Sequence, residues 1–502
     1  MSFHVLSGTL FGIDGILVHV EVDLLRKLPS ITIVGLPDSA VRESADRVRS
    51  AFQQSGFDLP RKRIVINLAP AALKKNGAAF DLPIAIGILS ASGHIPQKDI
   101  SNILFAGELS LSGALRPIKG ALSLVLMAKK EGISRVVIPY KNAQEATLVP
   151  DIEIIAAKNL CEAVAACFNK STPLQPQPHL HTPTVQPDMK EVKGQHRAKR
   201  ALEIAAAGGH NLLMIGAPGC GKTMLALRLP SILPIPSFKE ALEITQIYSA
   251  AGLQDQPYLQ TIRPFRAPHH SISCSGMLGN AQLQPGEASL AHHGVLFLDE
   301  LPEFRRDVLE ALRAPLEDRY IQLVRAQGRV LFPANISLVA AANPCPCGYF
   351  GHPHIPCRCT YAQRQRYLIK LSGPFFDRMD IQLWIDPLSG SELLKAPAGE
   401  DSKTLRQRVS RARTLQKKRY EGTSIVSNAQ LQGDLLQKHT PTDADAQCLL
   451  EKALKKNTLS ARGWAKVLKV SRTIADLESK PHIEEHHLLE ALSYRLPMGG
   501  VA

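Results

Sequence analysis

The sequence contains no apolar run long enough to cross a membrane. Its longest apolar stretches, such as residues 84–89 and 121–128, fall short of the roughly eighteen residues that a membrane-spanning helix needs. Residues 1–15, MSFHVLSGTLFGIDG, lack a basic stretch followed by an apolar core, so we expect no secretory leader, no membrane partner and a cytoplasmic protein. A hydrophobic content of 45% and a charged content of 21% exclude wholesale disorder.

Cysteine is scarce, with nine in 502 residues, which excludes a disulfide framework. Four thiols are nevertheless crowded into the pattern C-x-C-x9-C-x-C, at Cys345, Cys347, Cys357 and Cys359. Four thiolates are sufficient for a closed structural Zn²⁺ site, and the loop between the two pairs is long enough to fold back. We therefore predict structural zinc, in which His352 or His354 can replace a thiolate; four reduced cysteines in a proline-rich turn are the alternative.

The length suggests about three domains. A proline-rich stretch, STPLQPQPHLHTPTVQP at residues 171–187, is typical of a linker. We expect a first domain at residues 1–170, a linker at 171–189, a second domain at 190–388 and a third at 389–502. The net charge of +14 is spread over all three parts, so it allows a polyanionic partner without identifying one.

Apolar periodicity predicts a multidomain α/β chain with a helical C-terminal part. Short β-branched runs alternate with helical stretches in the first two domains, and only helical patterns follow residue 389. Strands are expected at 31–34, 64–68, 136–138, 212–215, 295–298 and 336–341, and helices at 39–56, 122–131, 402–420, 443–455, 461–477 and 483–495.

The strongest motif is GAPGCGKT at residues 216–223, which follows an apolar strand and precedes a helical stretch. Gly216, Gly219 and Gly221 allow successive backbone N–H groups to turn toward a phosphate. Lys222 would reach the β- and γ-phosphates, and the Thr223 hydroxyl would ligate Mg²⁺. The motif predicts a P-loop that binds ATP and Mg²⁺.

Two further strands end in polar residues that suit the same site. The run GVLFLDE at residues 294–300 has the uniform apolarity of a strand that is buried on both faces. Asp299 would hold Mg²⁺ through water, and Glu300 would polarise the attacking water. Asn343 ends the next strand and can orient that water, with a turn residue before Pro344 as the alternative.

Two arginines complete an ATPase layout. Arg378 lies in GPFFDRMD and Arg462 lies in LSARGW, on the expected helical segment 461–477. They suit stabilisation of transition-state charge, one in trans and one in cis, whereas surface salt bridges are the alternative. The order of P-loop, Asp-Glu strand, Asn strand, arginine and helical lid is that of an AAA+ ATPase.

The wording GVLFLDELPEF, LVAAANPCPCG, LSGPFFDRMD and LSARGWAKVLKVSRTIADL closely resembles the ComM (YifB) family of magnesium-chelatase-like AAA+ proteins, over nearly the whole chain. The resemblance implies a homo-hexameric ATP hydrolase that binds single-stranded, duplex and branched DNA in its pore. It implies branch migration of recombination intermediates during natural transformation, with recombinase-linked proteins as candidate partners. It makes Asn343 sensor 1, Arg378 the finger for the neighbouring subunit and Arg462 sensor 2, while Lys466 and Lys469 are supporting positions only.

Residues 61–142 resemble the Lon-protease-like domain, an α/β fold of the ribosomal S5 type, through KNGAAFDLP and GELSLSG. Active members use a serine nucleophile that a lysine activates. Those places fall here at Ala79 and Leu122, so we predict a domain without proteolytic activity. Ring assembly and a second DNA-facing surface are its expected roles, with a solvated charged face as the alternative.

Two insertions are expected to reach DNA. One begins with RPFRAPHHS at residue 263 and resembles the helix-2 insert of the magnesium-chelatase clade; the other, residues 320–332, reads as a β-hairpin. The candidate phosphate contacts are Arg263, Arg266, His269, His270, Arg325 and Arg329. Packing of these loops between subunits is the alternative, and the basic segment 403–420 is expected to be a solvated helix face.

Two other functions stay open. A MoxR-like or magnesium-chelatase-like chaperone that remodels a protein partner is the first. An ATP-dependent protease is the second, although it would have to act despite Ala79.

Overall fold

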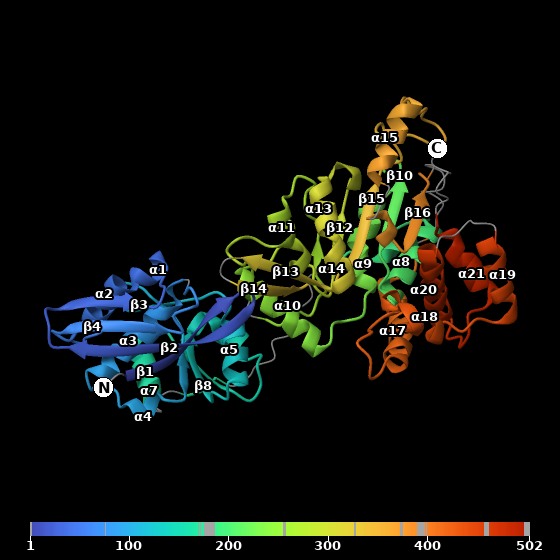
Figure 1. Ribbon diagram of the computed structural model, residues 1–502. Coiled ribbons are helices and arrows are strands. Elements are labelled where there is room, and N and C mark those ends of the chain that lie inside the picture. The colour runs from blue at the N-terminus through green and yellow to red at the C-terminus, as the bar shows by residue number, and fades with distance from the viewer. Residues whose placement is uncertain are drawn as a thin grey trace.

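The computed structural model describes residues 3–75, 77–168, 170, 172–174, 186–254, 258–325, 328–371, 375–388, 397, 399–455 and 461–495. An N-terminal α/β region, a central α/β core and a helical C-terminal region follow one another along the molecule (Figure 1). The predicted mixed α/β, multidomain architecture is confirmed. Most of the expected linker and the expected boundary at residue 389 lie outside the described residues.

The N-terminal region is built on a seven-stranded mixed sheet in the order β3-β4-β2-β1-β5-β8-β9. Helices α2, α3 and α7 share one hydrophobic core with the sheet, and α5 belongs to a second core that includes other strand residues. The strands are β1 (Phe3–Phe11), β2 (Asp14–Leu25), β3 (Ser30–Val34), β4 (Arg63–Ala69), β5 (Ile103–Phe105), β8 (Arg135–Pro139) and β9 (Glu153–Ala157), with a small pair β6 (Glu108–Leu109) and β7 (Leu115–Arg116). The helices are α1 (Ser39–Arg42), α2 (Ser44–Gln54), α3 (Asp81–Ala91), α4 (Gln97–Ile100), α5 (Ala121–Lys130), α6 (Ala143–Ala146) and α7 (Leu160–Cys167).

The central core contains a five-stranded sheet in the order β11-β12-β15-β10-β16, with every neighbouring pair parallel. Its strands are β10 (Leu212–Gly216), β11 (Phe265–Arg266), β12 (Val295–Leu298), β15 (Ser337–Ala342) and β16 (Ile381–Ile385). The helices are α8 (His196–Gly208), α9 (Lys222–Ile232), α10 (Phe238–Ala251), α11 (Cys274–Leu278), α12 (Glu287–Leu290), α13 (Arg306–Ala311), α14 (Arg313–Asp318) and α15 (Tyr361–Leu371). Because β15 lies between β10 and β12, the three predicted site strands end side by side.

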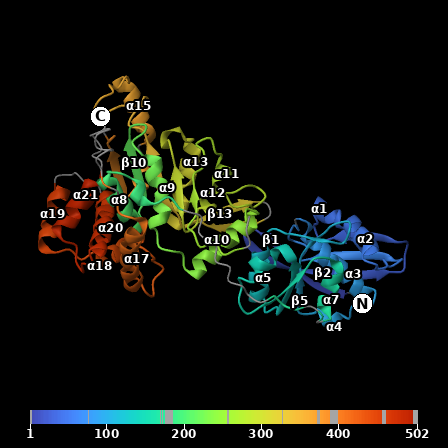
Figure 2. The same cartoon turned by 180° about the vertical axis from the view of Figure 1, so that it is seen from behind.

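The expected hairpin is present as antiparallel strands β13 (Tyr320–Arg325) and β14 (Gly328–Pro333). Its inner face is buried together with Ile13, which lies in the turn between β1 and β2. The fit is close, since a Cβ added at Gly12 would lie 2.4 Å from the Val330 side chain. Both views place the N-terminal region beside this hairpin (Figures 1 and 2). The hairpin is therefore a docking platform within one chain.

The C-terminal region consists of α17 (Ser402–Arg419), α18 (Gly433–His439), α19 (Ala444–Lys455), α20 (Ala461–Leu477) and α21 (Glu485–Ser493). Helix α20 packs against α8, α17 and α21. The prediction of a solvated face on α17 is only partly right, because Arg408 pairs with Glu203 and Glu400, and Arg413 donates to a backbone carbonyl. Among the described helices, none is both long and apolar enough to cross a membrane.

Candidate active site

The P-loop joins β10 to α9 at the carboxyl edge of the core sheet. Gly219 and Gly221 have φ values of +79° and +91°, a region that glycine enters without steric cost. The Lys222 ammonium donates to the carbonyl oxygens of Gly216, at 2.7 Å, and Ala217, at 3.0 Å. It also lies 3.2 Å from Oδ1 of Asn343. The predicted phosphate-binding lysine and the predicted sensor are thus in contact.

Oxygen ligands for a cation meet next to this lysine. The Thr223 hydroxyl donates to Oδ2 of Asp299 at 2.8 Å, and the Glu300 backbone N–H donates to the other carboxylate oxygen at 2.9 Å. A hydroxyl and a carboxylate are hard oxygen donors, which Mg²⁺ prefers. The residues present therefore fit the Mg²⁺ that accompanies ATP.

Glu300 has an unusual backbone and an unexpected neighbour. Its φ of +51° is left-handed, which is uncommon for a residue with a side chain and is typical of functional sites. Its carboxylate lies 3.5 Å from Nδ1 of His270, whose ring is tilted against that of His269 with centroids 4.0 Å apart. A histidine that the sequence suggested for DNA contact therefore touches the residue suggested to activate water.

Arg378 lies at the amino-terminal end of the parallel strands, opposite the end that carries the P-loop. It ends the short turn η5 (Phe376–Arg378) before β16, and its carbonyl accepts from the Asn211 side chain at 3.0 Å, just before β10. Because β10 and β16 are parallel, five residues of strand separate this edge from the P-loop, roughly 15 Å. The guanidinium pairs with Glu317 of α14. Arg378 thus lies away from the P-loop of its own chain.

Arg462 is found at the same edge, which changes its expected role. Its guanidinium lies 3.6 Å from the Asp377 carboxylate, and its side chain is 75% exposed. Helix α20 is anchored at that edge, because Thr473 is hydrogen bonded to His210 at 2.7 Å. The expectation that Arg462 acts in cis does not fit this placement. Both arginines lie away from their own P-loop.

Three family profiles match the chain in order. The profile of subunit ChlI of magnesium chelatase matches residues 20–142, that of magnesium chelatase subunit ChlI matches 188–393, and that of the ChlI C-terminal part matches 399–495. Competence protein ComM of Haemophilus influenzae is 42% identical over 504 residues, which cover 98% of this chain and 97% of that protein. YifB of Salmonella typhimurium is 43% identical over 488 residues, or 96% of this chain and 95% of that protein.

This chain belongs to the ComM (YifB) family. Its match to the magnesium-chelatase AAA+ profile and its formed P-loop indicate an ATPase that uses ATP and Mg²⁺. A Lon protease of Syntrophomonas wolfei is 25% identical over 174 residues, which are 32% of this chain and 21% of that protein. That similarity agrees with the Lon-like resemblance of the N-terminal region.

The Lon-like region of this ComM-family chain has no nucleophile at the expected places. Ala79 occupies the short turn η1 (Ala78–Phe80), and Leu122 is fully buried on α5. The neighbouring Ser123 hydroxyl is buried and donates to the Ile13 carbonyl at 2.6 Å. Its hydrogen bond serves the packing of α5 on the β1–β2 turn.

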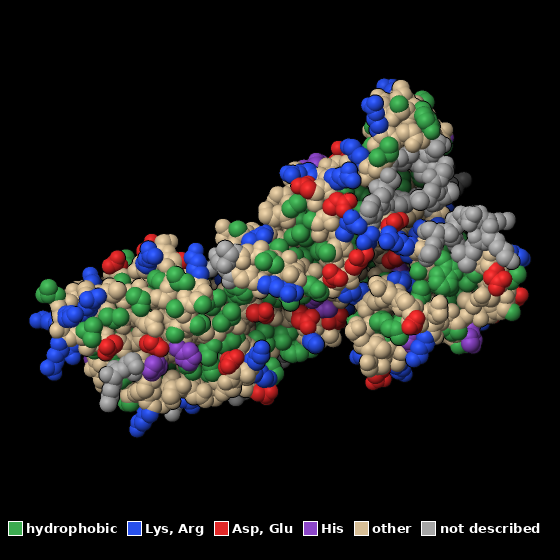
Figure 3. Space-filling view, viewed as in Figure 1, with side chains coloured by type: hydrophobic (Ala, Val, Ile, Leu, Met, Phe, Trp, Pro, Cys, Tyr) green, Lys and Arg blue, Asp and Glu red, His purple; other side chains and the backbone are tan. Residues whose placement is uncertain are grey.

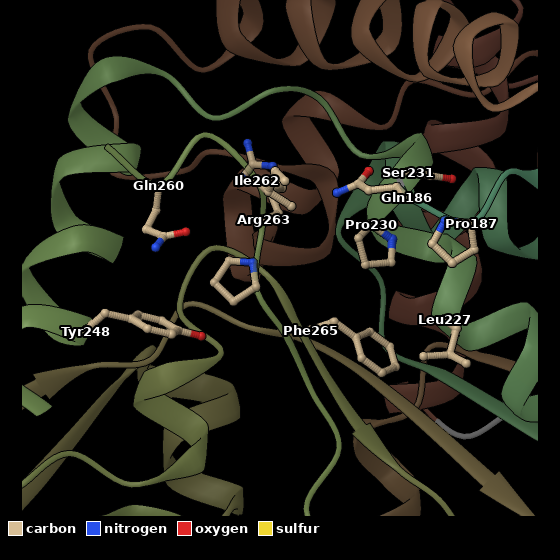
Figure 4. A pocket seen from close by; sticks show the side chains of 11 residues that line it. Gln186, Pro187, Leu227, Pro230, Ser231, Tyr248, Gln260, Ile262, Arg263 and Phe265 are labelled. Carbon is tan, nitrogen blue, oxygen red and sulfur yellow. The ribbon is translucent and has the colours of Figure 1, made fainter. Parts of the chain in front are cut away.

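Two of the six DNA candidates, Arg263 and Arg266, are partly buried and held in arginine–glutamate ion pairs. Arg263 is 12% exposed and donates to the carbonyls of Pro234, at 2.6 Å, and His293, at 2.8 Å, beside Glu240. It also lines a hollow of about 350 Å³, in which Tyr248 of α10 faces Leu227 of α9 with Phe265 between them (Figure 4). Arg266 forms a salt bridge with Glu287, in which its guanidinium donates two hydrogen bonds of 2.7 Å to the carboxylate.

The remaining DNA candidates are accessible. His269 bonds to the Ser271 hydroxyl at 2.8 Å in an exposed loop, and His270 is about one-third exposed. Arg325 and Arg329 are both exposed near the end of the β13–β14 hairpin, and Arg329, on its outer face, donates to Gln322 at 2.7 Å. Residues 326–327 lie outside the described residues.

The four clustered cysteines come together as predicted. Their sulfur atoms all lie within 4.8 Å of one another, and three of the pairs are 3.4, 3.6 and 3.7 Å apart. A tetrahedron with Zn–S bonds of about 2.3 Å has S···S edges of about 3.8 Å, so these thiols fit zinc. Neither His352 nor His354 belongs to this group of described ligand atoms.

Backbone amides stabilise negative charge on one thiol of this cluster, that of Cys347. Burial alone would raise the pKa of Cys347, but the N–H groups of Tyr349 and Arg358 and the neighbouring thiols lower this pKa to about 6. The loop also rests on the P-loop, because a Cβ added at Gly348 would lie 2.7 Å from Pro218. The cysteine loop is therefore a support for the phosphate-binding loop, a contact that spacing alone did not reveal.

Proposed function

We propose that this chain is the subunit of an ATP-driven ring that moves branch points in recombining DNA. One observation carries the proposal: the P-loop residues lie at one edge of the core sheet, while Arg378 and Arg462 lie at the other. In this proposal a second copy supplies the arginines, and repeated head-to-tail contacts of this kind generate a ring when the rotation between neighbours closes. Six subunits and a role in natural transformation follow the family resemblance and the name of the H. influenzae relative, competence protein ComM.

The residues divide the chemistry among them. Lys222 binds the phosphates, Asn343 and Glu300 orient the attacking water, and the neighbour's arginine pair stabilises the charge of the transition state. Mg²⁺, held by Thr223 and Asp299, would neutralise phosphate charge when bound. The Lon-like region contributes ring assembly without peptide hydrolysis.

Two exposed elements support DNA as the substrate. One consists of the accessible side chains of His269 and His270, in the loop after β11, and of Arg325 and Arg329, on the β13–β14 hairpin. The other is the arm that carries the cysteine loop and α15, which projects from the core (Figure 1). Residues 344–376 contain no Asp or Glu, and Arg358, Arg366 and Lys370 are exposed on it. Elsewhere on the visible face, basic and acidic side chains are intermingled (Figure 3), so this arm is the better phosphate-binding surface.

We propose in addition that Cys345, Cys347, Cys357 and Cys359 hold structural zinc. The S···S distances support this, since they match a closed tetrathiolate site. The site would keep the cysteine loop against the P-loop and orient the basic arm.

The deciding experiment is a branch-migration assay on synthetic three-strand and four-way junctions, run beside ATP hydrolysis. We expect DNA to stimulate ATP turnover and the junctions to resolve, and Lys222→Ala to abolish both. The magnesium-chelatase profiles favour one rival, a chaperone that remodels a protein partner. ATP turnover that DNA leaves unchanged and a protein partner stimulates would establish that rival instead.

A further inference from the structure

The turn that carries Arg378 is held by a lysine of the lid helix α20. The ammonium of Lys466 donates to the carbonyl oxygen of Asp377 and to that of Met379, the latter at 3.2 Å. These are the residues immediately before and after Arg378. Lys466 is only 9% exposed, so its ammonium is committed to this contact.

The rest of the turn is fixed as closely. The Arg378 carbonyl accepts from Asn211, so each of the three carbonyls from Asp377 to Met379 has a side-chain donor. One helical turn before Lys466, Arg462 contacts the Asp377 carboxylate. Residues four apart lie on one face of a helix, so a single face of α20 holds the η5 turn.

Burial of the charged Lys466 ammonium destabilises the fold. Burial lowers the pKa of Lys466 to about 8, although Asp380 and Asp377 favour the charged form; Arg495 and Lys469 oppose it. A lysine whose pKa is lower in the folded than in the unfolded protein destabilises the fold when it is charged, as it is at neutral pH. The free energy of unfolding therefore rises as pH increases from about 8 toward the pKa of lysine in the unfolded chain. A purely structural contact would be served by a neutral side chain.

We propose that Lys466 is a positioning residue for the arginine finger: it ties the η5 turn to the lid helix, so that Arg378 faces the ATP of the neighbouring subunit. This inference rests on the proposed ring, in which Arg378 acts in trans. It makes lid and finger one mechanical unit, and a shift of α20 moves the finger with it.

The test uses Lys466→Met in the full-length protein, with Lys469→Met as the matched control. Lys469 is also a buried lysine of α20, but its ammonium donates to the Ala429 carbonyl at 3.0 Å, away from the η5 turn. We expect Lys466→Met to reduce kcat for ATP about tenfold to a hundredfold with KM unchanged, because its own P-loop is intact and misplacing a catalytic group costs that much. Thermal stability should stay equal or rise, and Lys469→Met should keep normal turnover.

Mixed rings then separate the finger from the P-loop. Lys222→Ala subunits have no functional P-loop but an intact finger. Mixed one to one with Lys466→Met subunits, they should restore about a quarter of wild-type turnover, since a quarter of random interfaces join an intact P-loop to an intact finger. Arg378→Ala subunits mixed one to one with Lys222→Ala subunits should recover the same fraction of turnover as the Lys466→Met mixture. A mixture of Lys466→Met with Arg378→Ala subunits should recover nothing, because neither subunit has a functional finger.

The outcomes distinguish the two proposals. If Arg378→Ala alone keeps wild-type turnover, the proposed trans finger is wrong and this inference falls with it. If Arg378→Ala is inactive while Lys466→Met retains normal kcat, only the role of Lys466 is refuted. A Lys466→Met protein that melts several degrees lower and is not rescued by Lys222→Ala would assign the lysine to folding instead.

Discussion

Replacing one cysteine of the proposed zinc site should weaken the protein in a metal-dependent way. The perturbation is Cys357→Ser, which removes one ligand from a group whose sulfur atoms lie within 4.8 Å of one another. Three remaining thiols cannot close the tetrahedron, so bound zinc should fall from one equivalent per chain to well below half. Cys448→Ser, at an exposed cysteine outside the cluster, is the matched control.

The size of the effect follows from linkage. If zinc is present at a thousand times its dissociation constant, binding stabilises the folded state by about 4 kcal/mol. For a domain the size of the core, each kcal/mol changes Tm by about 2–4 °C, so loss of zinc should lower Tm by roughly 8–16 °C. ATP affinity should fall too, because the cysteine loop packs on Pro218 of the P-loop.

Metal content by mass spectrometry, Tm and ATP affinity are measured on protein purified under reducing conditions, before and after chelation. Readdition of zinc should restore Tm in the wild type and in Cys448→Ser, but not in Cys357→Ser. Less than a fifth of an equivalent of zinc in the wild type, together with an unchanged Tm in Cys357→Ser, would refute the zinc site.

Other sites give shorter tests. Glu300→Gln should retain ATP binding while turnover falls about a hundredfold to ten-thousandfold, measured by nucleotide binding and phosphate release; unchanged turnover would remove Glu300 from the chemistry. Arg325→Ala with Arg329→Ala should weaken DNA binding for every sequence alike and flatten its salt dependence by about two phosphate contacts; an unchanged salt slope argues against the hairpin. Hydrogen bonds from the His292–His293 pair lower the pKa of Glu243, so its contribution to stability is present above about pH 4.5 and is lost as pH falls below it. Glu243→Gln should therefore lower Tm more at pH 7 than at pH 3, and an equal loss at both would contradict this linkage.

The ATP site could be read from the sequence because its signals are local. A glycine-rich turn between a strand and a helix, and apolar runs that end in carboxylates or an amide, each specify their own conformation. The structure adds the sheet order, which places β15 between β10 and β12 and so brings Asn343 to Lys222. The helices and strands predicted from periodicity were close for the same reason, but others were not predicted, among them β1, β2, α8, α10 and α18.

What the sequence could not reveal depends on contacts between distant residues. Arg263 and Arg266 look like free cations in a loop, but Glu240 and Glu287 lie beside them in the fold. Arg462 belongs to a lid, and only the packing of α20 decides which edge of the sheet it reaches. The hairpin shows the same limit, since its alternation predicts two strands but not that one face would receive the β1–β2 turn.

These long-range contacts suggest how ATP turnover in the proposed ring would be coupled to movement. The strand that ends at Asn343 begins just after the hairpin on which the N-terminal region docks, and the loop that follows Asn343 leads into the cysteine cluster and the basic arm. The opposite end of the same sheet carries Arg378, the proposed finger, and Lys466 links its turn to the lid. Because packed interiors are dense and transmit small shifts, a change at the γ-phosphate has short, rigid routes to the hairpin and the arm within the chain. Its route to the finger runs through the adjacent subunit, so disrupting η5 should stop hydrolysis while leaving nucleotide binding by the same chain intact.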